Sequence, residues 1–197
     1  MDIFEESEQV TDPEVTRKKF EQEVRKFRAV EQQYRTKGIL IQNIQFPKIQ
    51  FAFCSTKLQP NIIGYSVLLD FTNYDTEPPS IKFVNPFTNG KLKREEIPFA
   101  FLQFKSPFQH QDLIQGGGTM DIFFCIPGVR EYHQHPAHSG DSWLLYRGKG
   151  EGTLLFILDQ LYLHSLSTIR GFLLQPITKM QLHQEFIVPQ INIQITQ

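Results

Sequence analysis

Apolar side chains near the N-terminus recur at steps of three and four positions, the spacing of one face of an α-helix. They are Phe20, Val24, Phe27, Val30 and Tyr34. Two helix starts are compatible with the sequence: Thr11 with Glu14 forms a capping box, or Asp12 caps with Pro13 in the first turn. We predict that the helix ends near Lys37-Gly38, because a glycine commonly follows the last turn.

After this glycine the apolar period changes to two, which is typical of strands with one buried face. The alternating positions are Ile49, Phe51 and Phe53, then Tyr65, Val67, Leu69 and Phe71, then Ile81 and Phe83. Turn-forming residues such as Pro60-Asn61 and Pro78-Pro79-Ser80 separate these segments. Such short links favour an antiparallel meander over strands joined by crossover helices.

More buried chain and a second helix follow. Phe99, Phe101 and Phe104 indicate further core, and three glycines at 116–118 precede the apolar run Ile122 to Ile126. Thr153 is in a position to cap a second helix. The apolar side of that helix consists of Leu154, Leu155, Leu158, Leu161 and Tyr162.

From Gly171 onward the chain is rich in Gln and ends in alternating Ile191, Ile193 and Ile195, which suits an added strand or a partner-binding tail. We therefore predict an α+β fold with a domain over residues 1–170 and a C-terminal extension over residues 171–197. The order is an N-terminal helix, a four-stranded antiparallel meander, a His-rich loop and a following helix.

Composition narrows the class of protein. With 197 residues the chain suits one domain, and 40% hydrophobic residues provide ample core. Its 20 basic and 21 acidic side chains give a net charge of −1, which favours neither nucleic acid nor an anionic membrane as a partner. We expect a cytoplasmic protein for three reasons. The chain has only two cysteines, begins with the acidic sequence MDIFEESEQ, and contains no apolar run long enough to span a membrane.

Three of the six histidines lie in the segment REYHQHPAHSGDSW, residues 130–143. In an extended segment His133 and His135 point to the same side, and Pro136 can turn the chain so that His138 joins them. Asp141 supplies an oxygen ligand or fixes a ring tautomer. This pattern predicts a Zn²⁺ site with one open position. In the competing interpretation His135-Pro136 is a structural turn in a polar loop.

Cys125 is the candidate nucleophile. A thiolate carries an acyl group when a nearby positive charge and partial exposure favour it, and Arg130 and the histidines are close in sequence. Alternatively Cys125 is a small buried apolar residue, because Phe124 and Ile126 flank it. Cys54 ends an alternating strand and is interpreted as structural.

The sequence Tyr74-Asp75-Thr76-Glu77-Pro78-Pro79-Ser80-Ile81-Lys82-Phe83 resembles the Tyr-Pro-x-x-Pro-Pro-x-Val-x-Phe signature of ubiquitin-conjugating enzymes. Asp75 replaces the first proline, and the spacing is kept. The order of elements over residues 13–168 is also similar to that family. The resemblance is greatest to divergent bacterial members found beside genes for ubiquitin-like proteins, activating enzymes and JAMM peptidases, some of them described as metal-binding.

In this resemblance His135-Pro136-Ala137 corresponds to the His-Pro-Asn turn of the family, with Ala in place of Asn. The family's cysteine would follow about ten residues later, where Trp143, Leu144 and Leu145 stand. Cys125, ten residues before His135, is the alternative nucleophile. The resemblance thus implies catalysis by Cys125 assisted by His133 or His135.

The implied function is to carry a ubiquitin-like protein as a thioester on Cys125. The implied partners are that modifier, a ubiquitin-activating-like enzyme and a JAMM-type peptidase, in a pathway associated with antiviral defence. A second interpretation is a non-catalytic zinc-binding adaptor that uses His133, His135, His138 and Asp141. A third is a metal-dependent hydrolase, because His133 to Pro136 matches the His-x-His-Pro core of JAMM enzymes, although Trp143 and Tyr146 replace its Ser and Asp.

Overall fold

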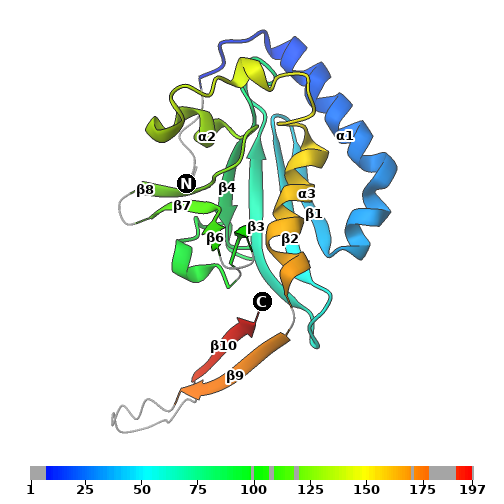
Figure 1. The fold of residues 1–197 in the computed structure, drawn as a ribbon. Helices are drawn as coiled ribbons and strands as arrows, with labels where there is room; N and C mark the ends of the chain where they lie inside the picture. Colours follow the sequence, from blue (N-terminus) through cyan, green and yellow to red (C-terminus); the bar gives the residue numbers. More distant parts are fainter. Residues whose placement is uncertain are drawn as a thin grey trace, which may run out of the picture.

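The computed structural model describes residues 8–98, 100–106, 109–117, 120–169, 171–177 and 190–196. A four-stranded antiparallel sheet carries helices on one face, and smaller hairpins and a long loop lie beside it (Figure 1). The predicted α+β fold, with its N-terminal helix and antiparallel meander, is confirmed.

Helix α1 spans Pro13–Thr36 and begins at the second of the two predicted starts. The Asp12 carboxylate accepts a hydrogen bond from the backbone N–H of Glu14 at 2.8 Å. The helix ends one residue before Lys37, and Gly38 follows with φ of +86°. A Cβ atom on Gly38 would lie 1.9 Å from the carbonyl oxygen of Cys54, so this close approach requires glycine.

The main sheet has the order β1-β2-β3-β4. Its strands are β1 (Ile39–Gln45), β2 (Lys48–Ser55), β3 (Ile62–Asp70) and β4 (Ser80–Val84). The three alternating segments of the sequence coincide with β2, β3 and β4. In β1 the register shifts between Ile41 and Asn43, which interrupts the alternation and hides this strand from a period-two search.

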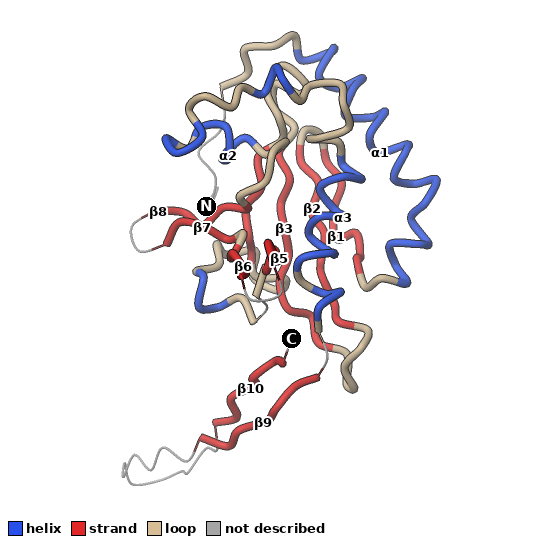
Figure 2. Tube along the Cα trace, in the orientation of Figure 1, coloured by secondary structure: helices blue, strands red, loops and turns tan. Residues whose placement is uncertain are grey.

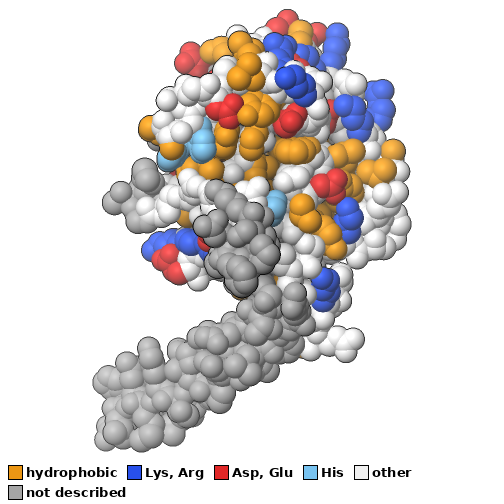
Figure 3. Space-filling model, in the orientation of Figure 1, with side chains coloured by type: hydrophobic (Ala, Val, Ile, Leu, Met, Phe, Trp, Pro, Cys, Tyr) orange, Lys and Arg blue, Asp and Glu red, His pale blue; other side chains and the backbone are white. Residues whose placement is uncertain are grey.

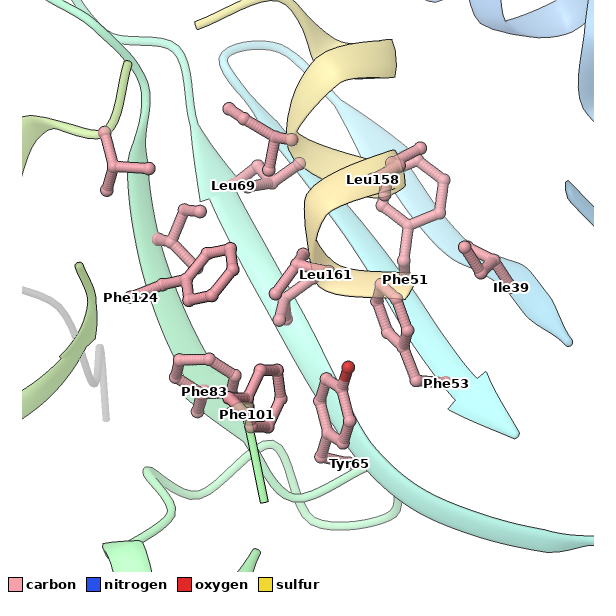
Figure 4. Packing of buried hydrophobic residues seen from close by; sticks show 14 of the residues in the cluster. Ile39, Phe51, Phe53, Tyr65, Leu69, Phe83, Phe101, Phe124, Leu158 and Leu161 are labelled. Atoms are coloured by element: carbon pink, nitrogen blue, oxygen red, sulfur yellow. The ribbon is translucent and has the colours of Figure 1, made fainter. Parts of the chain in front are cut away.

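The core lies between this sheet and the two long helices, α1 and α3 (Leu154–His164). The inward side chains of β2, β3 and β4 meet Leu158 and Leu161 of α3 (Figure 4). From α1, the Phe27 ring packs 5.2 Å from that of Phe51. Thr153 caps α3 as predicted, since its hydroxyl accepts from the N–H of Phe156.

Between β4 and α3 the chain forms a series of short strands and short helices (Figure 2). They are η1 (Arg94–Glu96), β5 (Leu102–Ser106), β6 (Gln109–Asp112), β7 (Ile114–Gly117), β8 (Met120–Phe124), α2 (Arg130–Gln134), η2 (Pro136–His138) and η3 (Trp143–Leu145). Phe101 is fully buried, as predicted for that stretch. Phe99 and Gly118 lie outside the described residues.

After η4 (Leu166–Thr168) the C-terminal segment forms its own hairpin. Strands β9 (Gly171–Ile177) and β10 (Gln190–Thr196) pair antiparallel with each other and not with the main sheet. The hairpin extends away from the sheet below α3 (Figure 1). In the part of the chain that the structure describes, no helix is long and apolar enough to cross a membrane.

Candidate functional site

Cys125 directly follows β8 and lies at the edge of the core. Its backbone N–H donates to the carbonyl oxygen of Leu113 at 2.7 Å, which fixes the start of the segment that leads into α2. The residue is 8% exposed, and burial raises the pKa of its thiol. A thiol in this setting is protonated at neutral pH and needs a base within reach to react as a thiolate.

The His138 ring lies within hydrogen-bonding range of that thiol. The Nε2 atom of the ring lies 3.4 Å from the Sγ atom of Cys125, across 13 residues of chain. His138 was predicted as a metal ligand, whereas His133 and His135 were predicted to assist Cys125. The one-turn η2 helix, which starts at Pro136, carries His138 back toward the end of β8.

The His138 ring stacks on the ring of Tyr132, with centroids 3.9 Å apart and planes inclined by 22°. The Tyr132 hydroxyl donates to Oδ2 of Asp141 at 2.6 Å, and the Tyr146 hydroxyl donates to the same oxygen at 2.8 Å. Burial and the hydrogen bond to Asp141 raise the pKa of Tyr132. The two tyrosine hydrogen bonds lower the pKa of Asp141, so its carboxylate stays ionised at neutral pH.

His133 joins two loops. It lies in α2, so the expected extended segment that would align it with His135 is wrong; helical backbone turns the two rings to different sides. Its Nδ1–H donates to the carbonyl oxygen of Asp141 at 2.7 Å, and its Nε2 accepts from the N–H of Gly128 at 3.2 Å. The Nδ1 atom of His135 accepts from the N–H of Ala137 at 3.3 Å.

The four predicted zinc ligands therefore have other partners. Both ring nitrogens of His133 are hydrogen-bonded, and the Asp141 carboxylate accepts from two tyrosines. Among the described residues, no three His, Cys, Asp or Glu side chains are grouped so that they can hold a metal. In this arrangement the side chains do not fit a zinc ion, and the zinc site stays a prediction.

Helix α2 is fastened to the 74–83 segment. The guanidinium of buried Arg130 donates to the carbonyl oxygens of Thr72 and Pro78, the latter at 3.2 Å, and lies 3.5 Å from the Glu77 carboxylate. The neighbouring carboxylate of Glu131 accepts from the Ser80 hydroxyl and from a backbone N–H of β4. The segment that resembles the conjugating-enzyme signature thus directly supports the His-rich loop.

Trp143 makes a second connection to the same segment. Its indole N–H donates to the carbonyl oxygen of Asp75 at 2.9 Å. The Asp75 carboxylate pairs with Lys19 of α1 and with Arg147, whose Nη2 lies 3.0 Å away. Burial opposes ionisation of Asp75, but the hydrogen bonds and charges of Lys19 and Arg147 outweigh it and lower the pKa of Asp75.

This lowered pKa predicts an acid-sensitive contribution to stability. The ion pairs stabilise the fold fully at pH values above the unfolded pKa of about 3.9, and less as the pH falls through the lowered folded pKa. Asp75→Asn should therefore reduce the free energy of unfolding at pH 7, and its difference from the wild type should narrow as the pH falls below about 3.9. Urea unfolding at several pH values tests this. A difference that persists unchanged at pH 3 would contradict it.

Comparison with known proteins gives the family. The sequence model of the Y4jH-like (Y4jH) family matches residues 11–107 and 96–169. The chain belongs to the Y4jH-like family. The "Uncharacterized protein y4jH" of Sinorhizobium fredii is 39% identical to it over 196 residues, which cover 85% of this Y4jH-like chain and 96% of that relative. The two matched ranges include both the 74–83 segment and every residue of the site from Cys125 to Asp141.

Two features of the Y4jH-like site were absent from the sequence interpretation. Tyr132 was not singled out, although it lies beside His133 and is the residue on which His138 stacks. The attachment of α2 to the 74–83 segment through Arg130 was also missed. A buried arginine has no periodic signal, so only the unusual density of polar side chains in residues 130–143 pointed to this region.

Proposed function

We propose that this protein is a ubiquitin-conjugating-enzyme-like carrier that accepts a ubiquitin-like protein as a thioester on Cys125, with His138 as the base. The contact of 3.4 Å between the Cys125 sulfur and the His138 ring carries the proposal. A nucleophile and a base at such a distance form the arrangement required for thiol acyl transfer. His138 takes the role that the sequence assigned to His133 or His135.

The order of elements supports this class of protein over an unrelated thiol enzyme. An N-terminal helix and a four-stranded meander precede the Cys125 segment, and α3 follows the His-rich loop. The 74–83 segment resembles the family signature, and Arg130 and Trp143 connect it to that loop. Sequence resemblance and contacts thus concern the same part of the molecule.

The proposed step is a transfer between two thiols. His138 Nε2 accepts the proton of the Cys125 thiol, and the thiolate attacks the carbonyl carbon of the modifier's thioester on the activating enzyme. A new carbon–sulfur bond forms at Cys125, and the bond to the activating enzyme's sulfur breaks. Because burial raises the thiol pKa, transfer of the proton to a neighbouring base is the part that this site must provide.

The direct test is charging with purified components. The protein is incubated with ATP, an activating-enzyme homologue and a ubiquitin-like protein from a bacterial operon of the resembling type. The expected product is a covalent adduct that thiol reductant removes. An adduct that survives reductant, or none with any such pair that is active on its own carrier, would contradict the proposal.

The zinc-binding adaptor remains the second candidate because His133, His135 and His138 cluster in the sequence, although the side chains as placed do not fit the ion. We expect little zinc in untagged protein measured by inductively coupled plasma mass spectrometry, since both nitrogens of His133 are already hydrogen-bonded. Near-stoichiometric zinc that is lost when His133, His135 and His138 are all replaced by Ala would favour the adaptor. A chelator would then also lower the melting temperature.

A further inference from the structure

The position of the His138 ring needs an explanation, because its backbone alone does not fix it. His138 is the last residue of the one-turn helix η2, and its side chain is only partly buried. Histidine side chains at such sites exchange rotamers readily. The orientation in the structure places Nε2 at 3.4 Å from the Cys125 sulfur.

Tyr132 is the side chain with the closest ring contact to His138. Their planes are nearly parallel at a centroid distance of 3.9 Å, which fixes the tilt of the imidazole. The Tyr132 ring also packs against the hydrophobic core, so it is a firm support. Its position on α2 is set in turn by the Arg130 contacts with the 72–78 backbone.

The far end of Tyr132 is anchored as well. Its hydroxyl donates to the Asp141 carboxylate, and the Asp141 backbone N–H donates to the carbonyl oxygen of His138 at 2.9 Å. The Asp141 carbonyl accepts from His133, which connects through Gly128 to the segment that carries Cys125. These hydrogen bonds connect the Tyr132 hydroxyl, Asp141, His133 and the His138 backbone to the segment that carries Cys125. We call this network the frame.

We propose that Tyr132, anchored by Asp141, is the positioning residue that holds the His138 imidazole against Cys125. This inference rests on the proposed function in treating the two side chains as the reacting pair. It assigns His133 and Asp141, predicted as zinc ligands, to the frame around that pair. Figure 3 shows the pale blue histidine side chains at the surface over α2, where a partner can approach them.

The test is the rate at which iodoacetamide alkylates Cys125 in the full-length protein at fixed pH, followed by peptide mass spectrometry. Tyr132→Leu removes the stacked ring and should slow alkylation about two- to tenfold, the range that one aromatic pair represents. Tyr132→Phe keeps the ring and should fall between the wild type and Tyr132→Leu. A partial recovery of the alkylation rate in Tyr132→Phe would show that the ring contact with His138 matters, and not only a general loss of local stability.

The matched control is Tyr162→Leu, the same substitution at a partly buried tyrosine of α3, which should leave the rate within about twofold of the wild type. In a His138→Ala background, Tyr132→Leu should cause no further change, because the ring that it positions is gone. An equal slowing in that background, or no slowing in the wild type, overturns the inference. If alkylation follows this pattern in the four proteins but Cys125 is not charged by a ubiquitin-like protein, the proposed function is wrong and the positioning role of Tyr132 is retained.

Discussion

Replacing Cys125 with Ala is expected to abolish the reductant-sensitive adduct with a ubiquitin-like protein. The thioester requires a sulfur atom, and no other described nucleophile lies beside the His138 ring in the way that Cys125 does. The measured quantity is the charged fraction after incubation with ATP, activating enzyme and modifier, on gels with and without reductant. We expect loss to the detection limit, a larger change than removal of a general base, which contributes about 10²- to 10⁴-fold.

The matched control is Cys54→Ala, which removes the other cysteine. Cys54 belongs to β2, is buried, and its sulfur lies 3.9 Å from the Ser55 carbonyl oxygen. This variant should charge normally after correction for a modest loss of stability. Charging of the Cys125 variant, or loss of charging in the Cys54 variant with an intact fold, would move the reaction away from the proposed site.

The fold was predictable where one physical rule determined the local structure. The apolar stripe of α1 and its Asp12 cap, the alternation in β2 to β4, and the Thr153 cap of α3 each left a clear trace in the sequence. Strand β1 was less visible because its register shift breaks the alternation. The hairpins β5–β6 and β7–β8 are too short for period alone to identify them.

The location of the candidate site in the chain was predictable, but the contacts between its side chains were not. Residue types pointed to Cys125 and to the histidines, but side-chain partners depend on the turn from α2 through η2. That turn brings His138 to the sulfur and sends the nitrogens of His133 into backbone hydrogen bonds. Sequence spacing could not show which histidine lies at the Cys125 sulfur, because helical and extended backbone place the same histidines differently.

The second large effect is expected from Arg130→Leu. Arg130 is 6% exposed, and its guanidinium contacts two carbonyl oxygens and the Glu77 carboxylate. Leucine fills part of the space but leaves the buried carbonyl oxygens of Thr72 and Pro78 without their charged donor, whereas the Glu77 carboxylate is 41% exposed and remains hydrated. Each buried acceptor left without a donor costs about 1–3 kcal/mol. We expect a loss of about 3 kcal/mol in the free energy of unfolding by urea.

The fluorescence of Trp143 reports on the contact between the His-rich loop and the 74–83 segment. Trp143 is the only tryptophan, and its N–H donates to the 74–83 segment that Arg130 holds. In Arg130→Leu its fluorescence should change at lower urea than far-ultraviolet circular dichroism does, because the loop separates before the sheet unfolds. Arg130→Lys keeps the charge without the planar fork of donors and should be intermediate.

Arg147→Ala is the matched control, since Arg147 also pairs with a carboxylate of the 74–83 segment but is 40% exposed. Exposed ion pairs contribute at most about 1 kcal/mol, so the two arginines should differ by at least twofold in their effect. Equal losses of stability in the two variants would mean that buried and exposed ion pairs contribute alike to holding the 74–83 segment. A large effect of Arg130 alone, with slower charging of Cys125 in the folded variant, would show that the buried arginine connects the signature-like segment to the thiol site.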